Sequence, residues 1–95
     1  MLSHVEANEL LDVYGDLLTQ RKKEILELYF QEDLSYTEIS EELSISRAAA
    51  QDSVQKSIKQ LQKYESVIQY ISKKKQVLSL VEKDNKLQSQ IEEIL

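Results

Sequence analysis

Arg47, Gln51 and Lys56 are polar side chains at near-helical spacing in the middle of the chain. Residues four apart on a helix face the same way, so Arg47 and Gln51 would project from one face. Arg and Gln both form paired hydrogen bonds with base edges, and Lys contacts phosphate groups. The chemistry that these residues indicate is recognition of a duplex and not a covalent reaction.

The residues that enzymes and metal sites require are scarce in this sequence. It has one histidine, His4, and no cysteine, so it offers neither a thiolate metal site nor a disulfide framework. It also has no Gly-rich phosphate loop and no carboxylate-histidine cluster at metal spacing. We therefore expect no catalytic residue, no metal and no cofactor, and we interpret the many acidic residues as solvated helix faces.

Arg47 and Gln51 belong to a segment, residues 34–54, with two helix starts, and Lys56 lies two residues beyond it. Ser35 followed by Glu38 is a capping box, and Ser46 is a second N-cap residue. Ile39 and Leu43 lie four apart on one face of the first helix. A short helix, a tight turn and a second, longer helix form the helix-turn-helix arrangement, which places its second helix in the major groove of DNA.

Composition favours helices throughout. Ninety-five residues with no Pro and one Gly predict one small all-α domain. No apolar run approaches the roughly 18 residues of a membrane span, and no basic apolar leader is present, so we expect a cytoplasmic protein without membrane contact. Residues 1–43 hold eleven acidic and three basic residues, a balance of −8, whereas residues 44–95 hold six acidic and nine basic, a balance of +3. The basic half includes the second helix, although a strong DNA binder usually has a more basic stripe.

Two helices are expected before the helix-turn-helix. The first covers about residues 5–18, and Thr19 caps the second. Residues 21–23 are three cations in the first turn of this second helix, where the helix dipole disfavours positive charge. Either a bound phosphate or pairing with Glu24 or Glu27 would compensate for that placement.

The helix that Ser46 opens has no breaker before Asp84, which predicts a continuous rod of up to about 50 Å at 1.5 Å per residue. Its apolar seam would extend past the helices that can cover it, and a short last helix would carry a second stripe. The uncovered residues are Ile68, Ile71, Leu78, Val81, Leu87, Ile91 and Ile94. We expect them to form a homodimer interface in a helical extension of residues 66–95, beyond a helix-turn-helix core of residues 1–65. The last helix folding back on the rod is the alternative.

The order of these segments resembles a known family. Residues 25–47 read ILELYFQEDLSYTEISEELSISR, a leading helix ends LLDVYGDLLT, and the tail contains KYESVI and LQSQIEEIL. Residues 17–64 resemble the fourth region of sigma-70-type factors, and the full layout is similar to the small YlxM-type proteins associated with the signal recognition particle. A sigma factor would carry core-polymerase-binding regions, for which this chain has no room. The resemblance implies a sigma region 4-like helix-turn-helix, of the winged-helix-like DNA-binding class, in the signal recognition particle pathway.

The helix-turn-helix pattern assigns positions within residues 34–59. Its interior positions match Ile39, Leu43, Ile45, Ala50 and Val54, and its DNA-binding positions match Arg47, Ala48, Gln51, Asp52, Gln55, Lys56 and Lys59. Ser44 stands where the turn often has Gly, and Ala50 where a larger aliphatic is usual, which predicts looser packing of the two helices. Asp52 repels phosphates and can accept only from cytosine N4 among base-edge groups. It either specifies a base or indicates that this surface does not meet DNA.

Two functions remain open on these grounds. One is a regulatory or accessory factor of the signal recognition particle pathway that binds DNA through its second helix. The other is a helical module that uses the same fold to contact a protein or RNA of that particle, without sequence-specific DNA binding. Arg47, Gln51 and Lys56 favour the first function. Asp52, the net charge of −5 and the uncovered apolar seam favour the second.

Overall fold

Side-chain caps open the first four α-helices in the computed structural model, which describes residues 2–95. Ser3, Thr19, Ser35 and Ser46 each accept a hydrogen bond from the backbone N–H three residues further on. The helices that follow them are α1 (His4–Tyr14), α2 (Gln20–Phe30), α3 (Tyr36–Leu43) and α4 (Arg47–Ile68). The predicted capping box is confirmed, because Glu38 Oε1 also accepts from the Ser35 N–H at 3.0 Å.

The first helix is shorter than the sequence predicts. α1 ends at Tyr14, and Gly15–Leu17 form a 3₁₀ turn, η1. Gly15 is buried at this corner, where an added Cβ would lie 3.2 Å from Leu11 Cδ2. The prediction of a continuous helix over residues 5–18 is therefore wrong at its end, because the chain turns there and places Leu18 in the core.

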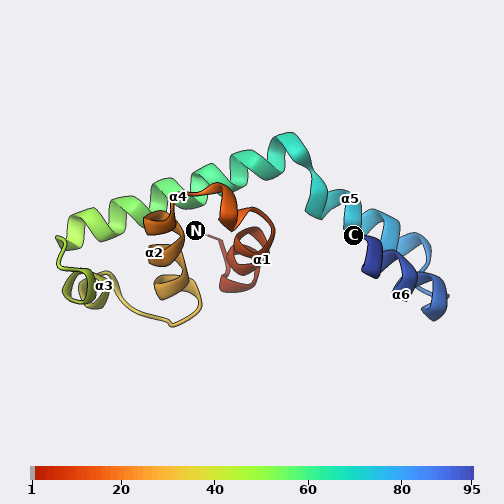
Figure 1. The fold of residues 1–95 in the computed structure, drawn as a ribbon, viewed down its shortest axis with the longest axis horizontal. Coiled ribbons are helices and arrows are strands. Elements are labelled where there is room, and N and C mark those ends of the chain that lie inside the picture. The colour runs from red at the N-terminus through yellow and green to blue at the C-terminus, as the bar shows by residue number, and fades with distance from the viewer. Residues whose placement is uncertain (1) are drawn as a thin grey trace.

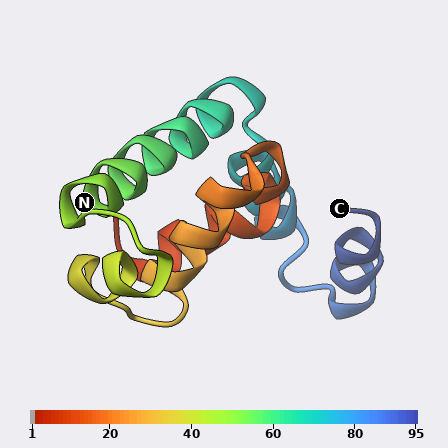
Figure 2. The ribbon, with the colours of Figure 1, turned by 60° about the vertical axis from the view of Figure 1, so that its left-hand side comes forward.

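The first four helices share one apolar core. α1, α2 and α3 lie on the same side of α4, as two views of the ribbon show (Figures 1 and 2). The buried apolar residues are Ala7, Leu10, Leu11, Tyr14, Leu18, Ile25, Leu26, Phe30, Ile39, Ala50, Val54, Ile58 and Leu61. All of them precede residue 62, and we call residues 4–68 the bundle.

The long rod that the sequence predicts is broken at Gln69. α4 ends at Ile68, Gln69 adopts the left-handed conformation with φ 57° and ψ 27°, and α5 (Tyr70–Leu80) continues in a new direction (Figure 1). With 22 residues, α4 is about 33 Å long at 1.5 Å per residue. The expectation of an unbroken helix to Asp84 is wrong because the chain satisfies the backbone groups at this joint with side chains from other turns, described below.

The last helix folds back on α5. Asp84 Oδ1 accepts from the Leu87 N–H at 3.0 Å and so caps α6 (Asn85–Ile94). α6 returns alongside α5 (Figure 1). The Tyr70 hydroxyl near the start of α5 donates to the Leu95 carbonyl. We call residues 70–95 the arm. No strand occurs anywhere in residues 2–95, and the whole measures 50 × 24 × 22 Å.

The break divides the predicted apolar seam. Ile71 packs against the core of the bundle, so the chain itself covers it. Three seam residues are exposed, namely Ile68, Leu87 and Ile94, and three are half-buried, namely Leu78, Val81 and Ile91. Neither α5 nor α6 has a fully buried residue.

Candidate nucleic-acid interface

α3 and α4 form the predicted helix-turn-helix. Between them Ser44 adopts the left-handed conformation, with φ 55° and ψ 44°, and the Ile45 N–H donates to the Ser40 carbonyl at 3.0 Å. This backbone conformation is the reason Gly is common at such a position. The sequence predicted looser packing between these two helices. Ile39, Ala50 and Val54 are nevertheless fully buried between them and the rest of the bundle, so their exposure gives no sign of looser packing.

One side of α4 points away from the bundle. Of the predicted DNA-binding residues, six are exposed, and they are Arg47, Ala48, Asp52, Gln55, Lys56 and Lys59. Gln51 is half-buried because it lies toward the edge of this side. We call these seven residues together with Lys63 the outer face of α4. Lys63 is exposed and was missed by the sequence analysis, although its spacing of four from Lys59 places both on one side of a helix.

Arg47 lies over the first of two stacked tyrosines. Its guanidinium carbon lies 5.8 Å from the centre of the Tyr36 ring, and that ring stacks on Tyr29 with centroids 4.9 Å apart and an interplanar angle of 12°. Burial, followed by a hydrogen bond with Tyr29, raises the pKa of Tyr36 to about 12, so its phenol stays neutral. A cation held over an aromatic face keeps its N–H groups available at the ring edge. Arg47 is thus partly ordered at the first turn of α4.

Asp52 is paired within α4. Its Oδ2 lies 3.2 Å from Lys56 Nζ, one turn further along the helix, and both side chains are largely exposed. Exposed pairs of this spacing contribute only about 0.3–0.5 kcal/mol. A phosphate could therefore compete with Asp52 for Lys56. Lys59 and Lys63 make no ion pair among the described residues, so their charges are not already offset.

The basic first turn of α2 is mostly engaged. Arg21 Nη1 lies 3.9 Å from Glu24 Oε1, as the pairing alternative predicts, and its Nη2 donates to the Leu43 carbonyl at 3.4 Å. That carbonyl is at the C-terminal end of α3, where the helix dipole favours a cation. Lys23 Nζ lies 2.6 Å from Asp16 Oδ1, and their hydrogen bond lowers the pKa of Asp16. Through Arg21, this turn contacts the C-terminal end of α3, the first helix of the helix-turn-helix.

His4, the one histidine of the chain, lies at the surface. His4 Nδ1 lies 3.2 Å from Asp33 Oδ1 at the surface, and its ring meets Phe30 edge-on. Within residues 2–95, no group of three or more His, Cys, Asp or Glu side chains could hold a metal ion. Over the same residues, no helix combines the length and the apolar character needed to cross a membrane.

Comparison with known proteins agrees with this arrangement. Residues 1–95 match UPF0122, the family described as "Putative helix-turn-helix protein, YlxM / p13 like". Similar relatives, each named a UPF0122 protein, come from Mycoplasma capricolum (39% identical over 79 residues), Clostridium kluyveri (36% over 77) and Desulforamulus reducens (41% over 81). These matches cover 83%, 81% and 84% of this chain and 70%, 69% and 69% of the relatives. The chain therefore belongs to the UPF0122 family of YlxM/p13-like helix-turn-helix proteins.

Proposed function

We propose that this protein binds nucleic acid through the outer face of α4 and acts as a regulatory or accessory factor of the signal recognition particle pathway. The observation that carries the binding proposal is the exposed start of α4, where Tyr36 orients Arg47. The family description supports a helix-turn-helix. The link to the pathway rests on the family resemblance alone.

The outer face divides into two functional parts under this proposal. Arg47 and Gln51, in the first two turns of α4, are within reach of base edges when the helix enters a major groove. Lys56, Lys59 and Lys63 follow along the helix and contact the phosphates, which supply sequence-independent affinity. Asp52 restrains Lys56 until a phosphate replaces it.

Binding of duplex libraries at several salt concentrations tests the proposal. Arg47→Ala or Gln51→Ala should cost about 1–3 kcal/mol on the preferred sequence and relax discrimination there. Lys59→Ala should weaken binding to every duplex and reduce the salt slope by about one unit. Lys83→Ala is the matched control, because it removes an exposed lysine from the arm instead of from α4.

Asp52→Asn gives the sharper result. If Asp52 only opposes phosphates, the variant releases Lys56, removes a repulsion and strengthens binding to all duplexes. If the carboxylate accepts from a cytosine amine, binding weakens at the preferred site alone. Dissociation constants that stay in the non-specific range of about 10⁻⁴–10⁻⁶ M for the parent and every variant would rule out groove reading by α4.

A helical interaction module is the second candidate, and the exposed apolar residues of the arm favour it. Leu80 and Ile94 are 84% and 82% exposed, and Leu87 is also exposed. We propose that these residues and their neighbours on the arm pair two copies of the chain or contact a protein or RNA of the signal recognition particle. Co-purification from native cells, with sequencing of bound nucleic acid and identification of bound protein, separates the two candidates.

A further inference from the structure

The joint between α4 and α5 needs acceptors for backbone N–H groups. A helix leaves its first N–H groups without partners inside the helix, and a side chain or water must satisfy them. Gln69 stands at the N-cap position of α5, but its side chain makes no capping hydrogen bond. The acceptors for α5 therefore come from elsewhere in the chain.

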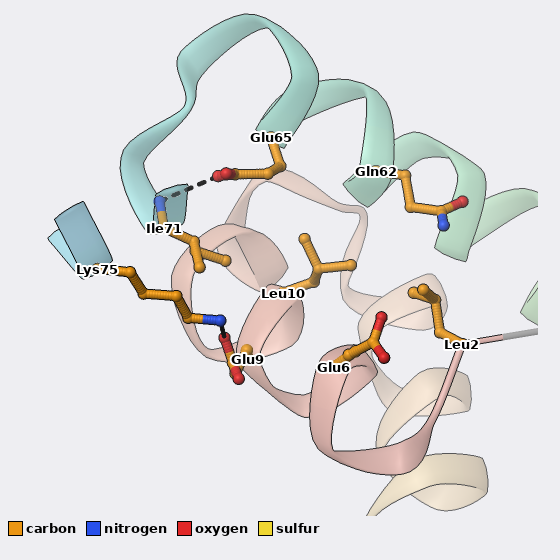
Figure 3. Close-up of a pocket in the computed structure, with 8 residues that line it drawn as sticks. All are labelled: Leu2, Glu6, Glu9, Leu10, Gln62, Glu65, Ile71 and Lys75. Carbon is orange, nitrogen blue, oxygen red and sulfur yellow. Dashed lines mark hydrogen bonds and ion pairs between the residues drawn. The ribbon is translucent and has the colours of Figure 1, made fainter. Parts of the chain in front are cut away.

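Glu65, in the last turn of α4, supplies most of them. Its Oε1 accepts from the Ile71 N–H at 3.0 Å and its Oε2 accepts from the Ser72 N–H at 3.0 Å (Figure 3 shows the bond to Ile71). Tyr14 of α1 joins the same group: its hydroxyl donates to Glu65 Oε1 at 2.6 Å and accepts from the Tyr70 N–H at 3.3 Å. We call these five residues the Glu65 clasp.

The charge of the clasp suits its position. A carboxylate is favoured at a helix N-terminus, where the dipole is positive. Burial would raise the pKa of Glu65, but the hydrogen bonds that the carboxylate accepts outweigh burial and lower the pKa below its ordinary value. Burial, followed by the hydrogen bond to Glu65, raises the pKa of Tyr14, which therefore keeps its proton as the donor.

Apolar packing across the joint is incomplete. A surface pocket of about 230 Å³, open to solvent, lies beside the clasp, between α1, the end of α4 and the start of α5 (Figure 3). Leu10, Gln62 and Ile71 are among the residues that line it. Lys75 reaches across to Glu9 of α1, with Nζ and Oε2 3.0 Å apart, as the second polar link between arm and bundle. These polar contacts therefore act together with Tyr70 and Ile71, which pack against the core of the bundle, in holding the arm.

We infer that Glu65 is a positioning residue that fixes the direction of the arm relative to α4. The clasp joins α1, α4 and α5 at one carboxylate, so its loss would free the arm to swing about Gln69 while the bundle stays folded. The arm carries the apolar residues proposed for pairing, and α4 carries the proposed nucleic-acid interface. The angle between α4 and the arm follows from the contacts of the clasp alone. What that angle means for function rests on the proposed function.

Distances between two spin labels test the inference without any nucleic acid. The sequence has no cysteine, so Glu42→Cys on α3 and Gln90→Cys on α6, both at exposed positions, accept the labels specifically. The parent should give one narrow distance peak. Glu65→Ala and Tyr14→Phe should lose that peak to a broad distribution, with the circular dichroism of the bundle retained. Exchange of the Ser72 amide hydrogen should rise by at least about tenfold in Glu65→Ala.

Tyr64→Phe is the matched control. It removes a phenolic hydroxyl from a ring close to Tyr14, and within residues 2–95 that hydroxyl bonds only to Gln60 of the same helix. It should keep the parent peak, and an equally narrow peak in Glu65→Ala would overturn the inference. If Glu65→Ala does not fold, Glu65→Gln keeps one carbonyl acceptor and turns a donor toward the Ser72 N–H. Fast exchange at Ser72 with protection kept at Ile71 supports the clasp, and unchanged exchange at both contradicts it.

This result is separable from the proposed function. A parent protein that shows the narrow peak but binds no duplex above the non-specific level would refute groove reading by α4 and leave the clasp intact. A broad peak in the parent, with specific duplex binding retained, would refute the clasp and leave groove reading by α4 intact.

Discussion

The bundle and the arm are held in place by different kinds of contact. The bundle buries thirteen apolar residues in one core, whereas neither helix of the arm buries any residue fully. The arm helices have eleven and ten residues, and isolated helices shorter than about 12–15 residues are marginal in water. The arm therefore depends on its contacts with α1 and α4, and on whatever covers its apolar side chains. One small chain thus combines a unit with its own core and a unit without one.

Paired truncations of two leucines should give the largest contrast between these regions. Leu26 has no exposed surface and Leu80 is 84% exposed. Leu26→Ala should lower the free energy of unfolding by about 2–5 kcal/mol, because it removes buried contacts and leaves a cavity. Leu80→Ala should change it by no more than about 0.5 kcal/mol. Denaturant titration of both variants checks this, and similar losses would mean that the arm has a buried core of its own in solution.

Pairing through the arm is the next largest effect. We predict a homodimer at micromolar concentration, because burial of several exposed side chains at about 1.5–3 kcal/mol each can offset an association cost of roughly 4–15 kcal/mol. Light scattering should give the mass of two chains. Ile94→Asp should lower the measured mass toward that of one chain. Val5→Asp, at an exposed apolar position of the bundle, should leave the mass unchanged. A single-chain mass for the parent would contradict pairing by the arm.

Acidification should release the arm before the bundle unfolds, and this is the smallest effect. The folded pKa of Glu65 is lowered, so the clasp is intact above the ordinary Glu pKa and is lost as the pH falls through the lowered value. Tyr14 donates to this carboxylate, and Glu6 and Glu9 from α1 and Lys75 from α5 line the pocket beside it. The label-to-label peak should broaden in that acidic range.

Two variants separate the contributions to this acid response. Glu65→Gln should make the distance distribution insensitive to pH in the same range, since the titrating group is gone. Glu9→Gln should keep the response, since it removes only the Lys75 pair. An acid response that survives in Glu65→Gln and disappears in Glu9→Gln would mean that the ion pair between Lys75 and Glu9, and not the Glu65 clasp, fixes the direction of the arm.

The features that the sequence predicted correctly depend on neighbours within one helical turn. The caps at Thr19, Ser35 and Ser46 each bond to the N–H three residues on, so their spacing alone is informative. The break at Gln69 was missed because no Gly, Pro or Asn marks it. The break is stabilised by Glu65 and by Tyr14, which donates to Glu65 from 51 residues away in the chain. A pattern of neighbouring residues cannot predict a contact between residues so far apart.

The candidate site was predictable to a similar extent. The helix-turn-helix pattern, together with helical spacing, named the residues of the outer face apart from Lys63, and the structure exposes all of those named except the half-buried Gln51. The pattern did not find the placement of Arg47 over Tyr36, which depends on how α3 packs against α4. It also placed residues 21–23 on α2 but not the bond from Arg21 to the Leu43 carbonyl, which depends on the angle between two helices. Tertiary contacts of this kind decide which polar side chains are ordered.

The single residue between α4 and α5 makes the arrangement sensitive to insertions and deletions. Each residue added after Gln69 would rotate α5 by about 100° about its axis and advance it by about 1.5 Å. The N–H groups of Ile71 and Ser72 would then no longer meet Glu65, which is six and seven residues earlier. A sequence one residue longer here would encode a differently directed arm even with every named side chain present. The number of residues in this interval is therefore as informative as their identity when a related chain is compared with this one.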